Sequence, residues 1–344
     1  MADARILSAQ VVVHGGPDEW GVPEHDFSTN SNACGPCPLA MQAVREADAL
    51  HYPDPSYTEL RARLAQWHGV SSERVVLAGS GSEWIRRFTA WVRLQAAHAH
   101  AQPPHIHWPA HAYGDYADAA QVWGLPHTSV RAQATLLWAC EPSSPMGQTD
   151  VSWLDTVHHL HAHQHVVLDL AYAPLRLSGQ PCLESPPMRD RVWQMWTPNK
   201  ALGMTGVRGA YAIAPLNQEN AVHELQALAP SWVLGGHAVA MLTAWTQHEV
   251  QHWLQTARET LRVWKAQQVA LCESLGWQIA PSEANYFCAQ LPQPLSGVQW
   301  QRLRARGVKL RDATSFGLPG WVRVGVLPPT SQDALARAWQ EVGA

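Results

Sequence analysis

Lysine is scarce in this chain of 344 residues. It occurs only as Lys200, Lys265 and Lys309, and arginine supplies nearly all of the positive charge. Lys265 lies in a stretch with helical spacing of apolar residues, which predicts a solvated helix face, and Lys309 is expected to be a surface charge. Lys200 differs, because it follows a Thr-Pro-Asn turn and precedes a glycine-rich run that ends at Arg208. This setting makes Lys200 a candidate for chemistry.

Charge and long apolar runs are also limited. The chain is 46% hydrophobic and 15% charged, with a net charge of -4, which is typical of a soluble globular protein. It has no basic patch, so we expect no nucleic-acid partner. It has no run of 18 apolar residues and no basic amino-terminal region followed by an apolar core. We therefore expect no membrane partner and a cytoplasmic location.

The cysteines and histidines show no framework of disulfides or metal ligands. Six cysteines, at positions 34, 37, 140, 182, 272 and 288, are scattered along the chain. The CGPC at 34–37 matches a redox motif, but it follows the polar run DFSTNSNA, which favours a structural turn over a thioredoxin-like site. Histidine-rich stretches at 98–107 and 158–165 lack carboxylate or cysteine partners, so we expect compositional bias and no metal.

Short apolar runs alternate with helical patterns through the middle of the chain. The runs lie at 74–79, 105–109, 135–140, 165–173, 192–198 and 209–214. Their alternation predicts an α/β fold with a mostly parallel sheet and helices on both faces. After about residue 235 a long helical stretch to Gly276 precedes short strands and two further helices, an α+β pattern. We expect an amino-terminal segment at 1–39 near the site, a large domain at 40–235 and a small carboxy-terminal domain at 236–344.

Ligands of such sheets bind at the carboxyl ends of the strands, where several chemical groups occur. Glycines and serines at 79–82 precede a predicted helix, and their backbone N–H groups could hold a phosphate, although such loops often only cap helices. Asp169 closes the run VVLDLAY, where an N-cap or an ion pair is the alternative. With Lys200 and Arg208, these groups suit pyridoxal phosphate, which needs a Schiff-base lysine, a carboxylate on its pyridinium nitrogen and donors for its phosphate.

Seven motifs follow one another along nearly the whole chain: GSGSEW, PAHAYGDY, CEPSSPMGQ, VVLDLAYAPL, TPNKALGMTGVRGAY, SEANYF and LRDATSFGLPGWVRVGV. In this order they resemble the class I/II aminotransferases of fold type I, which use pyridoxal 5'-phosphate. Within that superfamily the chain is similar to the histidinol-phosphate aminotransferase group and to the threonine-phosphate decarboxylase of cobalamin biosynthesis. Three further segments, HGGPDEW, DFSTNSNACGP and YPDPSYTELRARLA, favour the decarboxylase.

The resemblance implies roles for the residues that match its motifs. Lys200 would form the Schiff base and later move the proton at the substrate's α-carbon. Asp169 would keep the pyridine nitrogen protonated, Tyr172 would hydrogen-bond the 3-hydroxyl, and Tyr113 would stack on the ring. The residues implied at the cofactor phosphate are Gly81, Ser82 and Glu83 by their backbone, together with Thr197, Asn199 and Arg208. Tyr52 would reach the cofactor phosphate of a neighbouring subunit, which implies a homodimer.

The implied substrate residues are fewer, and a surface or interdomain role is the alternative for each. Arg323 matches the arginine that binds an amino-acid carboxylate. Arg311 and His14 are candidates for a substrate phosphate, and Asn30 lies in the segment that lines this region. Ser144 stands where the family has an asparagine that bonds the cofactor's 3-oxygen.

These implications lead to an expected reaction. We expect decarboxylation of L-threonine O-3-phosphate to (R)-1-aminopropan-2-yl phosphate in cobalamin biosynthesis, by a homodimer that takes a small phosphorylated amino acid. An aminotransferase acting on histidinol phosphate or a similar phosphorylated amine is the alternative. A non-catalytic regulator that keeps the fold is a third hypothesis, which the retention of Lys200, Asp169, Tyr172 and Arg208 disfavours.

Overall fold

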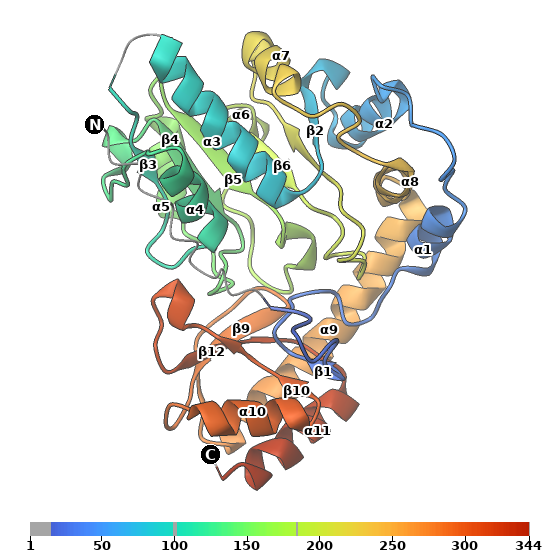
Figure 1. The fold of residues 1–344 in the computed structure, drawn as a ribbon, viewed down its shortest axis with the longest axis vertical. Helices are drawn as coiled ribbons and strands as arrows, with labels where there is room; N and C mark the ends of the chain where they lie inside the picture. Colours follow the sequence, from blue (N-terminus) through green and yellow to red (C-terminus); the bar gives the residue numbers. More distant parts are fainter. Residues whose placement is uncertain (1–14, 99–101, 184, 344) are drawn as a thin grey trace.

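The computed structural model describes residues 15–98, 102–183 and 185–343. Its largest layer is a six-stranded sheet with the strand order β2-β7-β6-β5-β4-β3 (Figure 1). In chain order the strands are β2 (Val75–Ala78), β3 (Ile106–His107), β4 (Leu136–Cys140), β5 (His165–Asp169), β6 (Trp193–Trp196) and β7 (Ala210–Ile213). Each strand lies inside one of the six predicted runs, and the run at 165–173 ends as a strand at Asp169.

The direction of the strands also agrees with the prediction. The pairs among β3, β4, β5 and β6 are parallel, and β7 is antiparallel to both of its neighbours. The sheet is therefore mostly parallel, and β4, β5 and β6 end at the same edge. Short 3-10 helices lie in the connections of this sheet, namely η1 (Ser72–Arg74), η2 (Arg131–Gln133) and η3 (Ala173–Leu175), and another, η4 (Thr314–Phe316), lies in the carboxy-terminal part.

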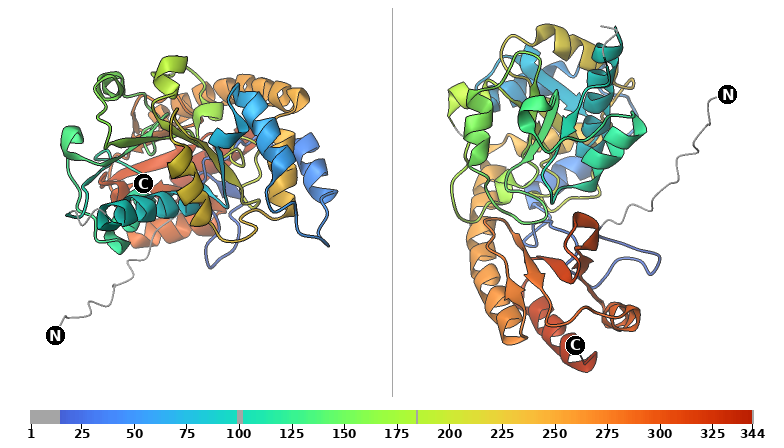
Figure 2. Two further views of the ribbon diagram at one scale, coloured as in Figure 1. Left: turned by 90° about the horizontal axis from the view of Figure 1, so that it is seen from above. Right: turned by 90° about the vertical axis from the view of Figure 1, so that its left-hand side faces the viewer.

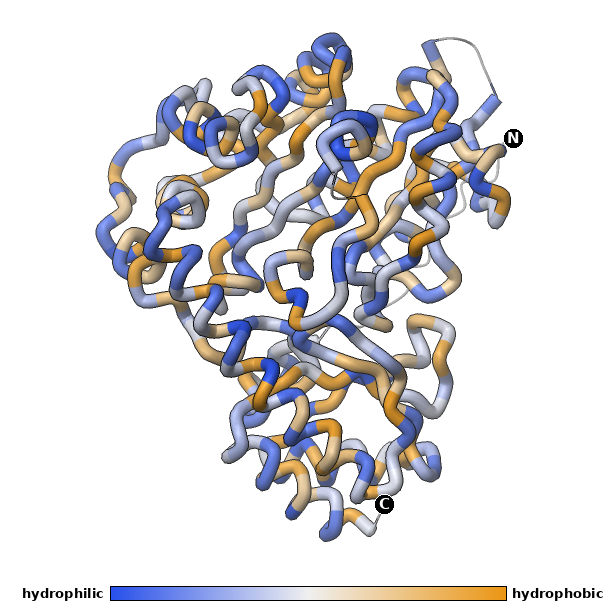
Figure 3. Tube along the Cα trace, turned by 180° about the vertical axis from the view of Figure 1, so that it is seen from behind, coloured by the Kyte–Doolittle hydropathy of each residue, from blue (hydrophilic) through white to orange (hydrophobic). Residues whose placement is uncertain are grey.

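Helices bury both faces of this sheet. Alternate residues of β2 belong to different cores, with Val75 and Leu77 in one and Val76 and Ala78 in the other. The helices on the Val76 face are α3 (Gly81–His98), α4 (Gly114–Val122) and α7 (Glu219–Ala227). The helices on the opposite face are α1 (Pro38–Arg45), α2 (Thr58–His68), α5 (Ser152–His158), α6 (Pro186–Arg189) and α8 (Gly236–Trp245). Burial on both faces explains why most strand residues are apolar, and Figure 3 shows orange stretches alternating with paler and blue ones through the upper part of the molecule.

The carboxy-terminal part holds a second sheet, with the antiparallel order β11-β12-β9-β8. The predicted helical stretch to Gly276 is two helices, because α8 ends at Trp245 and a new helix begins at His248. The elements after α8 are α9 (His248–Ser274), β8 (Gln278–Ile279), β9 (Tyr286–Gln290), α10 (Gly297–Ala305), β10 (Val308–Lys309), β11 (Arg311–Asp312), β12 (Trp321–Gly325) and α11 (Pro329–Glu341). The α+β pattern is thus present, and the domain limits at 39 and 235 stay predictions.

The amino-terminal segment lies against this carboxy-terminal part. Strand β1 (His25–Asp26) pairs in parallel with β10, and Figures 1 and 2 show the segment beside the small sheet and its helices. The backbone N–H of Gly325 donates to the carbonyl of Phe27 at 2.8 Å. Farther along, the N–H of Asn32 donates to the carbonyl of Lys200 at 2.9 Å. The segment therefore bridges the two sheets close to the predicted site.

The CGPC stretch leads directly into α1. Cys37 is the N-cap residue of this helix and is fully buried. Burial raises the pKa of the Cys34 thiol to about 11 and also raises the pKa of Cys37. Reactive redox cysteines have lowered pKa values, so these thiols support the structural turn.

No helix within residues 15–98, 102–183 and 185–343 is long and apolar enough to cross a membrane. Across those same ranges, no group of three or more His, Cys, Asp or Glu side chains could hold a metal ion.

Candidate active site

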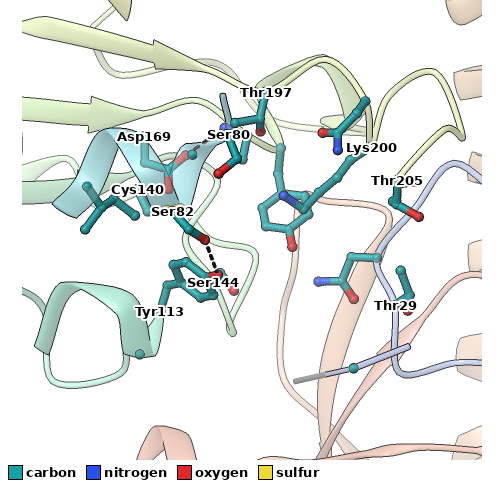
Figure 4. Close-up of a pocket in the computed structure, with 18 of the residues that line it drawn as sticks. Thr29, Ser80, Ser82, Tyr113, Cys140, Ser144, Asp169, Thr197, Lys200 and Thr205 are labelled. Carbon is teal, nitrogen blue, oxygen red and sulfur yellow. Dashed lines mark hydrogen bonds between the residues drawn. The ribbon is translucent and has the colours of Figure 1, made fainter. Parts of the chain in front are cut away.

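A cavity of about 370 Å³ lies where β4, β5 and β6 end, between the large sheet, the small sheet and the amino-terminal segment. Thirteen of the predicted site residues line it: Asn30, Gly81, Ser82, Tyr113, Ser144, Asp169, Tyr172, Thr197, Asn199, Lys200, Arg208, Arg311 and Arg323. Figure 4 shows several of them around one common space. Residues that are up to about 290 positions apart in the sequence therefore meet at one place.

Three predicted residues are not in this lining. The side chain of Glu83 accepts hydrogen bonds from Gly79 and Arg87, and its own N–H donates to the Ser80 hydroxyl at 3.1 Å. The Ser80 hydroxyl thus accepts this N–H, and the phosphate contact of Glu83 stays a prediction. Tyr52 is 76% exposed and stacks on Trp232 with 4.3 Å between the ring centroids. His14 lies outside the described residues.

Asp169 is held in a fixed orientation at the end of β5. Its Oδ1 accepts the N–H of Ala171 at 2.9 Å, and its Oδ2 accepts the hydroxyl of Tyr116 at 2.7 Å. Burial raises the pKa of Asp169, while these two hydrogen bonds and the charge of Lys200 lower it. A buried carboxylate with these partners could stabilise a cation that enters the cavity.

Sequence reasoning missed Tyr116, although a signal was present. It lies three residues after Tyr113 on α4, and this spacing places two side chains on the same face of a helix. Its ring stacks on Trp138, with 4.9 Å between the centroids and 8° between the planes. Burial raises the pKa of the Tyr116 phenol well above its ordinary value, so it acts as a hydrogen-bond donor.

Lys200 extends into the cavity from the turn that follows β6 (Figure 4). Its Nζ lies 5.2 Å from the centroid of the Tyr172 ring. The backbone of the turn is fixed, since the Lys200 carbonyl accepts from Gly203 and from Asn32. An amine and an aromatic hydroxyl thus share the cavity with the Asp169 carboxylate.

Donors for an anion gather at the start of α3. Gly81 is the first residue of this 18-residue helix, and a Cβ there would lie 3.0 Å from Thr197 Cγ2, so a side chain at this position would press on Thr197. The Thr197 hydroxyl is buried and has no hydrogen-bond partner. Ser82 forms a 3.2 Å hydrogen bond with the Tyr113 hydroxyl (Figure 4), and Arg208 lines the same cavity. A helix N-terminus with these side chains can hold a phosphate.

Two arginines enter the cavity from the small sheet. Arg323 Nη2 donates to the Ser28 carbonyl at 2.9 Å, and its Nη1 contacts Ser144 Oγ at 3.4 Å. Ser144 therefore faces the guanidinium of Arg323. Arg311 stacks over the Phe316 ring at 4.7 Å. Burial lowers the pKa of Arg311 to about 10, and the positive charge of Arg323 is the second cause, so the two cations repel each other in the cavity wall.

Asn30 is the clearest sign of a missing ligand. It is 2% exposed and lines the cavity, and neither Oδ1 nor Nδ2 has a hydrogen-bond partner. A buried amide without partners is costly unless a bound molecule satisfies it. Further lining residues that the sequence did not single out are Ser28, Thr29, Cys140, Thr205, Ser315 and Phe316.

The other two lysines are not the surface charges that we expected. Lys265 Nζ donates to the carbonyls of Ser282 and Ala284 at 2.5 and 2.8 Å, and burial lowers its pKa to about 8. Lys309 Nζ donates to the carbonyl of Gly16 at 2.6 Å and lies 2.9 Å from an oxygen of Asp18. Both predictions were wrong because each lysine finds its partners in a segment that is distant in the sequence.

The sequence model described as aminotransferase class I and II matches residues 23–342. The chain belongs to the aminotransferase class I and II family. Its curated relatives in this family include the histidinol-phosphate aminotransferase of Akkermansia muciniphila, which is 24% identical over 94% of this chain and 92% of the relative. That of Symbiobacterium thermophilum is 28% identical over 91% of this chain and 90% of the relative.

Solved structures of two other proteins show the same fold. The histidinol-phosphate aminotransferase of Sinorhizobium meliloti, in complex with pyridoxal-5'-phosphate, gives a TM-score of 0.78 at 20% identity over 99% of this chain and 98% of that one. The L-threonine-O-3-phosphate decarboxylase of Porphyromonas gingivalis gives a TM-score of 0.75 at 19% identity over 92% of this chain and 98% of that one. The predicted fold type is therefore confirmed.

This family uses pyridoxal 5'-phosphate, so the predicted cofactor and enzyme class are confirmed at the level of the family. The cavity fits this cofactor on three separate observations. A lysine amine and a buried carboxylate face the same space, the start of α3 has room for a phosphate beside the unpartnered Thr197 hydroxyl, and the volume suits a small ligand.

Proposed function

We propose that Lys200 carries the cofactor and that the other cavity residues orient it. The observation that carries this proposal is the shared cavity in which the Lys200 amine and the buried Asp169 carboxylate meet. When bound, pyridoxal 5'-phosphate supplies an electron sink for a bond to the substrate's α-carbon. Asp169 would hold the proton on the pyridine nitrogen, and Tyr172 would donate to the 3-oxygen. Lys200 would move the proton at the α-carbon.

The remaining cofactor residues would bind the phosphate and the ring. The backbone of Gly81 and Ser82, with Thr197, Asn199 and Arg208, would hold the phosphate at the start of α3. Tyr113, placed by Ser82, would stack on the ring and exclude water from it. Ser144 faces Arg323, so we propose that it orients this arginine instead of replacing the asparagine of the family.

The substrate site would bind two anionic groups. Arg323 and Arg311 are both mostly buried, and the Asn30 amide beside them has unused donor and acceptor atoms. We propose that Arg323 binds a carboxylate and Arg311 binds a phosphate, with Asn30 contacting the same molecule. The substrate is then a small amino compound that carries a phosphate.

Transamination of histidinol phosphate or of a similar phosphorylated amine is the reaction that the comparisons support better. The curated relatives cited above are histidinol-phosphate aminotransferases and extend over most of this chain. In this reaction Arg323 would bind the carboxylate of the keto acid that accepts the amino group. The Lys200 amine would then transfer the proton between the α-carbon and the cofactor.

Decarboxylation of L-threonine O-3-phosphate, for cobalamin biosynthesis, is the second candidate. Its support is the segment that begins in HGGPDEW and continues through DFSTNSN, because this segment supplies Gly15, Ser28, Thr29 and Asn30 to the cavity wall. In this reaction Arg323 would bind the substrate's own carboxylate, which would leave as carbon dioxide, and Lys200 would return a proton to the α-carbon.

The two reactions differ in their need for a second substrate. An aminotransferase given histidinol phosphate alone should transfer one amino group per site and stop, then resume when 2-oxoglutarate is added. Sustained release of carbon dioxide from L-threonine O-3-phosphate without any keto acid would select the decarboxylase instead. Arg311→Gln is the matched variant. It should lower the affinity for phosphorylated substrates and leave the absorbance of the bound cofactor unchanged. If neither compound reacts, the proposed substrate class is wrong.

We also propose a homodimer. Tyr52, Trp232 and Leu50 are exposed by 76%, 42% and 90%, and Tyr52 and Trp232 stack on each other. Exposed aromatic and aliphatic side chains of this kind are typical of a protein interface. In a second copy of the chain, Tyr52 would reach the cofactor phosphate of its neighbour.

A further inference from the structure

The amino-terminal segment forms one wall of the cavity with almost no regular structure of its own. Gly15, Ser28, Thr29 and Asn30 are in the lining, and the strand β1 within this segment has only two residues. The position of the wall must therefore depend on contacts with other parts of the chain.

Asp18 makes the most extensive of these contacts. Arg304 on α10 donates Nε to Asp18 Oδ2 at 2.9 Å and Nη2 to Oδ1 at 2.8 Å, and Lys309 Nζ lies 2.9 Å from Oδ2. Arg304 Nη2 also donates to the carbonyl of Gly21, which exchanges backbone hydrogen bonds with Asp18. The three charged side chains are at most 21% exposed. Two cations thus hold one carboxylate and the turn around it.

A chain of hydrogen bonds leads from this cluster to the cavity. Lys309 Nζ donates to the Gly16 carbonyl at 2.6 Å, and the Gly16 N–H donates to Ser28 Oγ at 2.8 Å. The Ser28 carbonyl accepts from Arg323 Nη2 at 2.9 Å. A Cβ on Gly15 would collide with the backbone of Ser28. The two stretches of chain that form the wall therefore pass each other without a side chain between them.

We propose that Asp18 is a positioning residue for substrate binding. Through Lys309, Gly16 and Ser28 it fixes the wall of the cavity and the guanidinium of Arg323. The inference rests on the proposed function in one respect, namely that Arg323 binds an anionic group of the substrate. It adds a determinant of affinity that lies outside the cavity, in a turn that touches no ligand.

Asp18→Asn tests the proposal, because it keeps the size of the side chain and removes its charge. The matched control is Glu341→Gln, which breaks the Arg306–Glu341 pair at 2.8 Å on the surface of the same carboxy-terminal part. In the holoenzyme without substrate, amide hydrogen exchange at residues 15–24 should become about tenfold faster in Asp18→Asn, as expected for the loss of a charge-assisted hydrogen bond. Glu341→Gln should exchange like the wild type.

Substrate affinity is the second measurement. For the substrate that the enzyme turns over, KM should rise about tenfold in Asp18→Asn, while kcat and the cofactor absorbance change little, because the groups that act on the α-carbon are untouched. If no phosphorylated amine is turned over, the dissociation constant of 2-oxoglutarate, whose carboxylate Arg323 would bind, takes the place of KM and is measured by calorimetry on the holoenzyme. A rise in that constant would support the positioning role even though the proposed reaction had failed.

Two results would overturn the proposal. One is unchanged exchange at 15–24 in Asp18→Asn, and the other is faster exchange with unchanged KM and unchanged affinity for 2-oxoglutarate. Lys309→Met serves as a second variant if Asp18→Asn does not fold, since Arg304 still holds Asp18 in it. It should reproduce the rise in KM because it removes the bond to the Gly16 carbonyl.

Discussion

Replacing Tyr116 with phenylalanine removes one buried hydroxyl and keeps the ring that stacks on Trp138. The lost bond is the 2.7 Å hydrogen bond from Tyr116 to Asp169 Oδ2. A hydrogen bond to a charged acceptor contributes about 1.5–3 kcal/mol, so the free energy of unfolding of the cofactor-free protein should fall by about 2 kcal/mol at neutral pH.

The loss of unfolding free energy in Tyr116→Phe should depend on pH, because the lost hydrogen bond involves the ionisable Asp169 carboxyl. Burial raises the pKa of Asp169 above the ordinary 3.8, so the folded state favours the protonated carboxyl more than the unfolded chain does. The Tyr116 hydroxyl stabilises mainly the ionised form. The difference between variant and wild type should therefore be complete above the folded pKa of Asp169 and should shrink as the pH falls through it.

Urea unfolding of the cofactor-free proteins, from about pH 8 down to about pH 4, measures both effects. Tyr57→Phe is the matched control, because the Tyr57 hydroxyl is buried and exchanges hydrogen bonds only with the neutral backbone of Leu234, at 2.8 and 3.0 Å. Tyr57→Phe should lower the free energy of unfolding by about 1 kcal/mol at every pH. A loss in Tyr116→Phe that is as small as the control's, or that does not change with pH, would refute the role assigned to Tyr116.

Two further predictions concern the residues proposed to act on the cofactor. Borohydride reduction of the holoenzyme at neutral pH, followed by peptide mapping, should place a pyridoxyl group on Lys200; a label on Lys265, whose pKa is about 8, or on Lys309 would refute the assignment. Asp169→Asn should keep its circular dichroism spectrum and lose about a hundredfold or more in kcat, because an amide carries no charge to hold the pyridinium proton. Turnover near that of the wild type would show that Asp169 is only structural.

Much of the fold could be predicted because its signals are local. The six strands of the large sheet fall inside the predicted runs, since a strand buried on both faces is apolar at most of its positions. Asp169 and Lys200 were found for a related reason, because parallel strands bring their carboxyl ends to one edge. The break between α8 and α9 was missed, since Thr246 and Gln247 interrupt the helix without a proline or a glycine.

The sequence by itself thus determined which segments become strands and helices, and it singled out Asp169 and Lys200, which lie in one cavity. Only the tertiary structure decided the partners of the polar side chains. Asp18 meets Arg304 across 286 positions, Tyr116 meets Asp169 across 53, and the N–H of Glu83 is taken by a neighbouring hydroxyl. The physical reason is that the spacing of apolar residues that specifies a helix or a strand involves only residues within that element. A hydrogen bond between distant residues forms only after the elements have packed.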